Sequence, residues 1–161
     1  KAYAEYVRRS ENPLPLLVAD LGEQPAEAIL REIGEPRLRG MLRLAGYIPN
    51  SDLPAIYNRA SAFLYTSLRE SFGIPQLEAM ACGTPVVTSA TSAIPEVAGE
   101  GAILVDPTDP KAIADALLRL ETDAAFRARQ VAYGLERVKR FSWEKTARHL
   151  LALYESLGKT N

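Results

Sequence analysis

Short apolar runs alternate with helical patterns along this chain, and that alternation limits the folds that it can adopt. The runs are bounded by Gly, Pro, Asp or Ser, which is typical of short buried strands. They cover residues 14–19, 42–45, 62–66, 85–89 and 102–105. Strands that alternate with helices predict right-handed βαβ units. We therefore expect an α/β fold with one Rossmann-like parallel sheet and helices on both of its faces.

Apolar residues recur at helical spacing in the segments between these runs, and Pro, Asp and Gly mark several helix ends. Asp109-Pro110 is a good capping pair, and Ser51-Asp52 is expected to cap another helix. Trp143 is expected to anchor the last helix against the core, and the tyrosines are expected to be packing residues. The expected helices cover residues 1–11, 24–34, a segment from 53, 75–81, one turn at 94–98, a segment from 110, 124–139 and 143–157.

The composition narrows the class of protein. The chain has 161 residues and 47% hydrophobic content, enough for a single domain over residues 1–161. With 19 basic and 20 acidic residues it has no basic excess for nucleic acid. No apolar stretch approaches the ~20 residues that span a bilayer. A single cysteine, Cys82, and a single histidine, His149, argue against a disulfide or a zinc site. We expect a cytoplasmic protein without a metal.

One loop leads from a strand end into a helix with residue types that suit an anionic ligand. Its sequence is Glu70-Ser71-Phe72-Gly73-Ile74-Pro75-Gln76-Leu77-Glu78. Gly73 lets the backbone approach a ligand, and the free N–H groups of the following helix favour a phosphate.

Two carboxylates flank that helix start, with Glu70 in the loop and Glu78 expected on the first helical turn. Ionised carboxylates only accept hydrogen bonds, so beside a phosphate they need hydroxyl-rich partners. A ribose and a hexose on either side of a diphosphate are such partners. The loop therefore suggests a sugar nucleotide, although acidic residues that merely stabilise the helix start remain an alternative on spacing alone.

Residues 46–107 resemble the C-terminal domain of the retaining glycosyltransferases known as glycosyl transferases group 1, a family-4-like group with the GT-B fold. The similarity is carried by a Glu, seven residues and a second Glu, from Glu70 to Glu78. Two further blocks match, EAMACGTPVV and AIPEVAGEGAILVDP, and FSWEKTA is similar to the C-terminal helices of the family. The resemblance extends over about residues 14–157.

The resemblance implies roles for individual residues. Glu70 would bind hydroxyls of the transferred sugar and is the candidate catalytic residue, while Glu78 would bind the ribose hydroxyls. The loop backbone would hold sugar hydroxyls and phosphate oxygens, and the end of the second strand would lie against the base. Ser89 and Ser92 would border the site. The implied donor-binding residues are Glu70, Ser71, Phe72, Gly73, Ile74, Glu78, Gly46, Tyr47 and Ile48.

The resemblance also implies an activity in carbohydrate biosynthesis. A hexose would pass from a nucleotide diphosphate sugar, such as a UDP- or GDP-hexose, to an acceptor hydroxyl with retention of configuration and without a cofactor. An N-terminal acceptor domain, expected to precede residue 1, would complete the active site and supply any peripheral membrane contact. An Arg and a Lys that neutralise the diphosphate in this family would also precede Lys1. The chain alone is therefore expected to be inactive.

Three other functions stay open at this point. A non-catalytic nucleotide-binding regulatory module would bind nucleotide without any dependence on the sugar. A sugar-nucleotide epimerase would need a cluster of acid and base residues, and the sequence shows no such cluster. A domain that only packs against a partner would bind no ligand.

Overall fold

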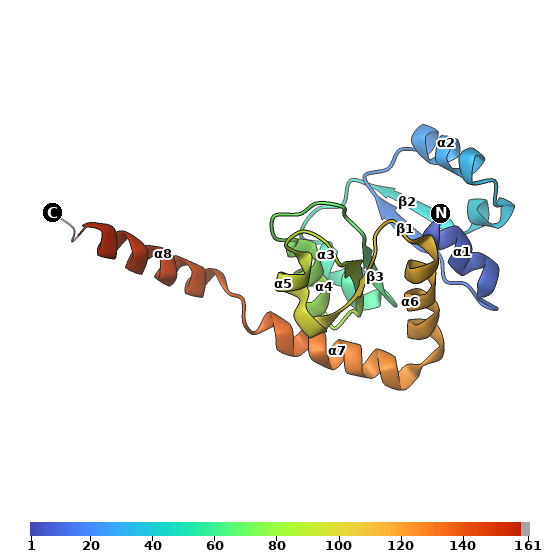
Figure 1. Ribbon diagram of the computed structural model, residues 1–161. Helices are drawn as coiled ribbons and strands as arrows, with labels where there is room; N and C mark the ends of the chain where they lie inside the picture. The colour runs from blue at the N-terminus through green and yellow to red at the C-terminus, as the bar shows by residue number, and fades with distance from the viewer. Residues whose placement is uncertain (159–161) are drawn as a thin grey trace.

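The structure is a computed structural model that describes residues 1–158, and it confirms the predicted alternation of strands and helices (Figure 1). The first strand starts two residues later than expected, because Pro15 has no N–H to donate to a ladder. The strands are β1 (Leu16–Ala19), β2 (Leu42–Gly46), β3 (Phe63–Tyr65), β4 (Val86–Ser89) and β5 (Ala102–Val105).

The helices follow the predicted segments closely. The carboxylate of Asp109 caps its helix, accepting from the N–H groups of Lys111 and Ala112. Asp52 does not cap α3, because its backbone is already helical and its side chain accepts from Ser51 instead. The helices are α1 (Ala2–Arg9), α2 (Glu23–Ile33), α3 (Leu53–Arg59), α4 (Ile74–Ala81), α5 (Ile94–Ala98), α6 (Pro110–Thr122), α7 (Ala124–Val138) and α8 (Trp143–Gly158), with 3-10 turns η1 (Pro36–Gly40) and η2 (Gly99–Gly101).

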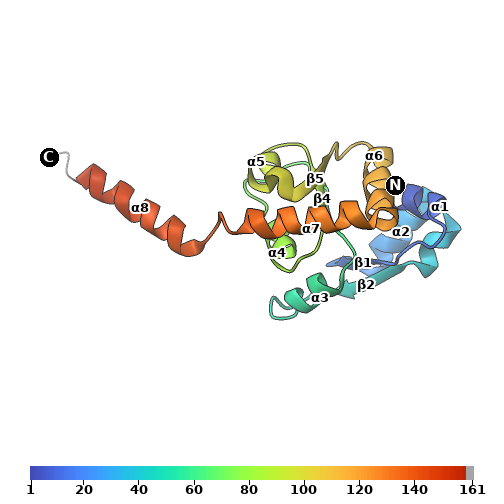
Figure 2. The ribbon, with the colours of Figure 1, turned by 90° about the horizontal axis from the view of Figure 1, so that it is seen from below.

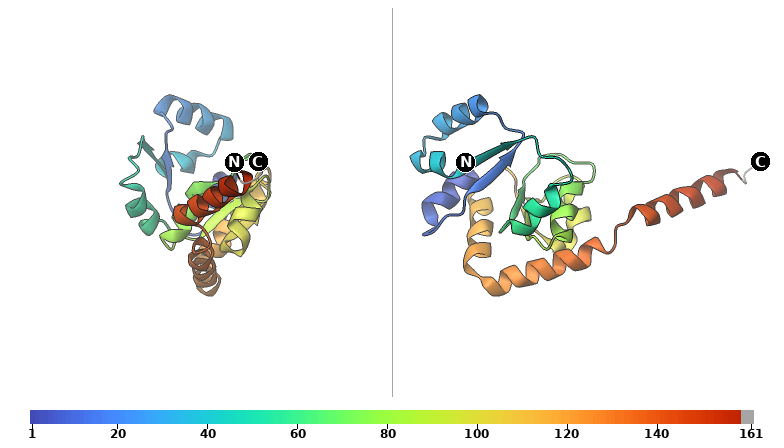
Figure 3. Two further views of the ribbon diagram at one scale, coloured as in Figure 1. Left: turned by 90° about the vertical axis from the view of Figure 1, so that its left-hand side faces the viewer. Right: turned by 180° about the vertical axis from the view of Figure 1, so that it is seen from behind.

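All strand pairs are parallel, as expected, but the hydrogen-bonded sheet is divided into two parts. One part has the order β1-β2 and the other has the order β3-β4-β5. In one common doubly wound sheet, the strands lie side by side in the order 3-2-1-4-5-6. In that order, β1 and β2 would correspond to strands 2 and 3, and β3, β4 and β5 would correspond to strands 4, 5 and 6. No strand within residues 1–158 fills the position between β1 and β3, and the two parts are visibly separate (Figure 3).

Helices cover both faces of the three-stranded part, as the sequence predicted. Val86 and Val87 are adjacent in β4, fully buried, and point to opposite faces. Val86 packs with residues of α3, α4 and α5, while Val87 packs with residues of α6 and α7. The same expectation is wrong for one face of β1, where Leu17 is 46% exposed and packs in none of the three core clusters, because no helix covers its side chain.

Helix α8 projects away from the body of the domain (Figures 1 and 2). It contains no buried residue, and Trp143 at its start is 79% exposed. The expectation that Trp143 anchors this helix to the core is therefore wrong, because the helix meets no surface on which to pack. Within the described part of the chain, no helix is long and apolar enough to cross a membrane.

Candidate functional site

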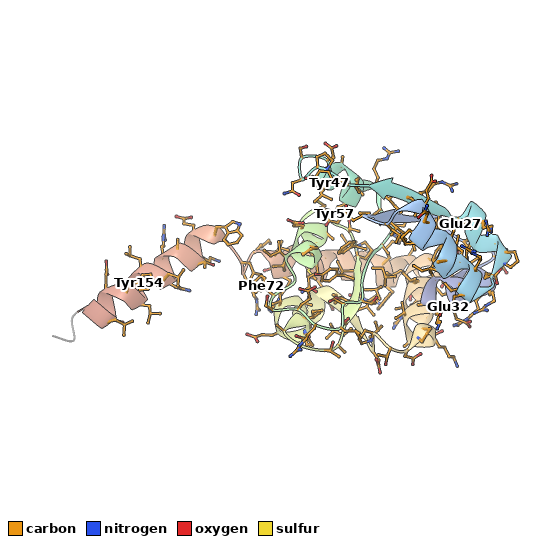
Figure 4. All side chains as sticks on the ribbon, turned by 90° about the horizontal axis from the view of Figure 1, so that it is seen from above. Glu27, Glu32, Tyr47, Tyr57, Phe72 and Tyr154 are labelled. Atoms are coloured by element: carbon orange, nitrogen blue, oxygen red, sulfur yellow. The ribbon has the colours of Figure 1, made fainter. Side chains whose placement is uncertain are left out.

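Most of the predicted site residues lie in loops that follow the carboxyl ends of parallel strands, where ligands of open α/β sheets bind, while Ile74 and Glu78 lie in helix α4. Gly46 ends β2, the segment from Thr66 to Gly73 follows β3, and Ser92 follows β4. Figure 4 shows Tyr47, Tyr57 and Phe72 towards the end of the body from which α8 leaves. Glu27 and Glu32 lie at the opposite end.

The two carboxylates of the loop do not cap the helix between them. Helix α4 begins at Ile74, after Gly73 in the left-handed conformation with φ of 85°. Glu78 is the fifth helical residue and not part of the first turn, as had been expected, and Glu70 lies four residues before the helix. No side chain caps this N-terminus. The interpretation that these residues merely stabilise the helix start therefore loses its support.

Each carboxylate is instead held by a tyrosine hydroxyl. Tyr65 donates to Glu70 Oε1 at 2.6 Å, and Tyr57 donates to Glu78 Oε2 at 3.5 Å. The ring of Phe63 lies between the two tyrosines, stacked on Tyr65 at 5.8 Å and edge-on to Tyr57 at 5.2 Å between ring centroids. A continuous row of three rings therefore connects the two carboxylates.

The pKa values of both tyrosines reflect this environment. Burial, followed by the hydrogen bond and charge of the adjacent carboxylate, raises the pKa of Tyr65 to about 12. Burial and the charge of Glu78 likewise raise the pKa of Tyr57 to about 12. Sequence reasoning treated these residues only as packing residues. The two-residue spacing of Phe63 and Tyr65, which puts both rings on one face of a strand, was the signal available.

Hydroxyl side chains at the end of β4 and just after it hold the main chain that leads to Glu70. Thr88 donates to the carbonyl of Tyr65 at 2.8 Å, and Ser89 donates to that of Ser67 at 2.5 Å. Thr91 reaches the carbonyl of Leu68 at 3.4 Å, and Ser92 reaches that of Glu70 at 2.6 Å. We call these four residues the hydroxyl ladder. Ser89 is fully buried, so it supports the loop from within and does not border the site as expected.

Gln76 supports the other end of the loop. Its side chain is fully buried, and Nε2 donates to the carbonyl of Phe72 at 3.3 Å. The ring of Phe72 also meets Phe141 edge-on, at 5.7 Å between centroids. The turn before α4 is therefore held in place by the Gln76 amide, which binds its main chain, and by the Phe141 ring, which packs on Phe72.

The segment at the end of β2 has the exposed backbone that contact with a base requires. Gly46 has a φ of 61°, and Tyr47 is 77% exposed. The carbonyl of Gly46 accepts a hydrogen bond from the N–H of Asp20 at 2.9 Å, which ties this segment to the end of β1. A carbonyl has a second lone pair that stays available to a ligand. Ile48, the third residue expected here, is half-buried.

The two carboxylates of the loop have tyrosine hydroxyls as their hydrogen-bond donors within the part of the chain that the structure describes. Within residues 1–158, neither Glu70 nor Glu78 forms an ion pair, and no group of acidic, Cys or His side chains is arranged to hold a metal ion. Two surface hollows of about 230 and 350 Å³ lie beside α2 and α1, and no residue of the loop lines either of them. The loop thus offers acceptors and helix N–H groups on an open surface.

Comparisons with known proteins show the family to which the chain belongs. Residues 1–137 match the family model described as glycosyl transferases group 1. The O-antigen chain mannosyltransferase B of Escherichia coli is 42% identical over 118 residues, covering 73% of this chain and 31% of that protein. The D-inositol 3-phosphate glycosyltransferase of Corynebacterium urealyticum is 38% identical over 133 residues, or 81% of this chain and 31% of that protein. The chain thus spans less than a third of the length of these relatives.

Solved structures show the same fold. Sucrose-phosphate synthase from Thermosynechococcus elongatus superposes with a TM-score of 0.82 and 28% identity, over 99% of this chain and 43% of that one. Alr3699/HepE of Anabaena, in complex with UDP and glucose, superposes with a TM-score of 0.83 and 18% identity. That match covers 96% of this chain and 44% of the other. In each of these structures, the part that matches this chain makes up less than half of the protein.

Proposed function

Because this chain belongs to the group 1 glycosyltransferases, we propose that it is the donor-binding domain of a retaining enzyme. The whole enzyme transfers a hexose from a nucleotide diphosphate sugar to an acceptor hydroxyl. Mannose and glucose are the sugars to test first, since one relative is a mannosyltransferase and the Anabaena structure holds UDP and glucose. The second half of the active site comes from an acceptor domain in the same longer protein.

In this proposal, different residues bind the different parts of the donor. Glu70 accepts hydrogen bonds from hydroxyls of the transferred sugar, and Glu78 accepts them from the ribose. Between them, the loop backbone and the first N–H groups of α4 face the diphosphate, where the helix terminus favours negative charge. The backbone of residues 46–48 lies against the base. These roles require neither a cofactor nor a metal.

In this proposal the domain contributes positioning and electrostatic stabilisation. Among the described residues of the loop, no side chain is placed as an activated nucleophile beside a general base. The fixed carboxylates orient the sugar, and the dipole of α4 stabilises the charge that grows on the leaving diphosphate. The acceptor hydroxyl attacks from the same face as the leaving group departs, which retains the anomeric configuration.

One observation carries the proposal. Two carboxylates eight residues apart flank a helix N-terminus, yet neither one caps it and neither one is ion-paired within the described chain. Acidic groups left with only tyrosine partners suit a ligand that donates many hydrogen bonds. A nucleotide sugar has a hydroxyl-bearing ring on each side of its diphosphate.

We further propose that the 161-residue chain binds donor weakly and transfers nothing by itself. Arg69 is the only cationic residue in the loop from Ser67 to Glu78, and it forms no ion pair within residues 1–158. A diphosphate beside two carboxylates needs more positive charge than that. A cytoplasmic location, in which the enzyme meets its nucleotide sugar, completes the proposal.

Calorimetric titration tests the donor assignment directly. UDP, GDP and ADP are titrated into the chain, followed by UDP-glucose and GDP-mannose. We expect one nucleotide to bind in preference to the others, and its sugar conjugate to bind more tightly. Binding of nucleotide without any gain from the sugar would instead support the regulatory module, and absence of binding to every compound would contradict the donor site.

Substitution of the two carboxylates separates their roles. Glu78→Ala should weaken the binding of nucleotide and of its conjugate alike, by about 1.5–3 kcal/mol for the loss of a charged hydrogen bond. Glu70→Ala should remove only the gain from the sugar. Glu96→Ala is a matched control, because Glu96 is an exposed acidic residue in the first turn of α5. Equal binding by all of these variants would contradict the site.

A further inference from the structure

We propose that Tyr65 and Ser92 are positioning residues that hold Glu70 in place for the transferred sugar. This inference rests on the donor-binding function proposed above and assigns it two residues that do not themselves contact the donor. Tyr65 fixes the carboxylate of Glu70, and Ser92 fixes its main chain. Together they determine where the acceptor atoms for the sugar hydroxyls lie.

The carboxylate is fixed by a hydroxyl on a rigid support. Tyr65 is the last residue of β3, and its N–H and C=O groups belong to the ladder with β4. Its ring is stacked on Phe63, so the hydroxyl that donates to Glu70 Oε1 at 2.6 Å has little freedom. No other donor within residues 1–158 reaches this carboxylate, which leaves Oε2 for a sugar hydroxyl.

The main chain of Glu70 is fixed separately by Ser92. The hydroxyl of Ser92 donates to the carbonyl of Glu70 at 2.6 Å and accepts from its N–H at 3.3 Å. Ser92 has a φ of 59°, in the left-handed region that non-glycine residues adopt at an energetic cost. Strained residues persist where the surrounding contacts hold them, and here the contact is the double hydrogen bond to the residue proposed to bind the sugar.

The arrangement differs between the two carboxylates, and this difference makes the inference specific. Glu78 is exposed on a helix, and Tyr57 reaches it only at 3.5 Å, the limit of a hydrogen bond. Glu70 is half-buried, and it is held both at its carboxylate and at its main chain. A flexible glutamate loses rotamer freedom on binding, whereas one that is already ordered does not. Loss of Tyr65 should therefore affect sugar recognition and leave nucleotide recognition intact.

A double-mutant cycle between Tyr65 and Glu70 tests the inference. Tyr65→Phe, Glu70→Ala and the combined variant are titrated with UDP and UDP-glucose, and with GDP and GDP-mannose. We expect Tyr65→Phe to raise the Kd of the sugar conjugate about three- to tenfold and to leave the Kd of the nucleotide unchanged. In the Glu70→Ala background, which has no side-chain acceptor for the Tyr65 hydroxyl, the same substitution should have no further effect, because Tyr65 acts only through Glu70.

Ser92→Gly provides a second variant that does not depend on the aromatic row. Glycine adopts the positive φ of this position freely, so the variant removes the hydroxyl without strain in the loop. It should weaken binding of the sugar conjugate selectively, as Tyr65→Phe does.

Tyr133→Phe is the matched control for Tyr65→Phe, because Tyr133 is a half-exposed tyrosine of α7. The thermal midpoint of each variant shows whether the domain remains folded.

The outcomes separate this inference from the proposed function. If Glu70→Ala leaves the gain from the sugar intact, or if the chain binds no conjugate more tightly than its nucleotide, the function assigned to Glu70 is wrong and the inference is overturned with it. If Glu70→Ala removes the gain while both Tyr65→Phe and Ser92→Gly keep it, only the inference is overturned. Equal weakening of nucleotide and conjugate by Tyr65→Phe, or an effect of Tyr65→Phe that persists in the Glu70→Ala background, would reveal a general structural role and overturn it too.

Discussion

Gln76 lies directly against Gly73 at the turn that starts α4. A methyl group on Gly73 would lie 2.8 Å from Gln76 Nε2, which is closer than side-chain carbons approach such atoms. Gly73 also has a φ of 85°, a conformation that side chains rarely adopt. A substitution at this position meets both a strained backbone and a buried amide that has little room to move.

We therefore expect Gly73→Ala to destabilise the domain by about 1–3 kcal/mol, the typical cost of a strained backbone position. Urea denaturation measures the change in the free energy of unfolding. Gly40→Ala is the control, since Gly40 has no positive φ and open space where its methyl group would lie. Similar stabilities for the two variants would show that this turn is not constrained by Gln76.

Helix α8 should contribute little to the stability of the domain. It contains no buried residue, so deletion of the residues after Ser142 should change the free energy of unfolding by less than about 0.5 kcal/mol. Trp143 is the only tryptophan and is 79% exposed, so its fluorescence should already resemble that of a water-exposed indole and shift little on unfolding. A blue-shifted emission that moves to the red in urea would show that α8 packs on the domain.

The tyrosines that hold the two carboxylates should make the domain sensitive to alkaline pH. The pKa values of Tyr57 and Tyr65 are raised from 10 to about 12 in the folded state. Below pH 10 both states keep these protons, whereas above it the unfolded state loses them first, which favours unfolding. Stability should therefore fall between pH 10 and 12.

Comparison with the Tyr57→Phe/Tyr65→Phe variant isolates this effect. Urea denaturation at pH 9 and at pH 11 gives the loss of stability for each protein, and the loss should be smaller in the variant. The variant should still lose some stability between pH 9 and pH 11, because burial also raises the pKa of Tyr3 to about 12. Identical losses would mean that the pKa values of Tyr57 and Tyr65 are not raised in the folded protein.

The division of the sheet should be visible in amide hydrogen exchange. Leu16 and Phe63 donate their N–H groups to neighbouring strands, so Leu17 and Leu64, one residue further on, direct theirs to the opposite edges. No strand within residues 1–158 pairs with those edges. Leu17 and Leu64 should therefore exchange much faster than Val87 in the buried central strand. Equal protection of these three amides would show that a partner covers the edges.

The sequence predicts the elements well because their signals are local. Apolar runs locate the strands, and Asp109 caps its helix as the residue type indicates. Whether α8 packs on the domain cannot be predicted in this way, because its apolar stripe with Trp143 has the same sequence pattern whether or not another surface covers it. The exposure of Leu17 has a similar origin, because it depends on a neighbour of β1 and not on its own residues.

The candidate site shows the same limit. The spacing of Glu70 and Glu78 finds both carboxylates, but it does not reveal what holds them. The hydrogen bond from Tyr65 depends on how β3 faces the loop, and that from Ser92 links positions 22 residues apart in the chain. Such contacts follow from the tertiary fold, so a tyrosine that orders a carboxylate has the same local pattern as one that only packs.

The hydroxyl ladder has a consequence for how this loop can evolve. All four of its hydroxyls bind main-chain carbonyls, and none of them depends on a side chain of the segment from Tyr65 to Glu70. Leu68 and Arg69 are exposed, so mutations at these positions leave the course of the backbone unchanged. Under the proposed function, new side chains at these two positions would lie beside the donor while Glu70 keeps its place, so substrate preference would change without loss of the chemistry assigned to Glu70.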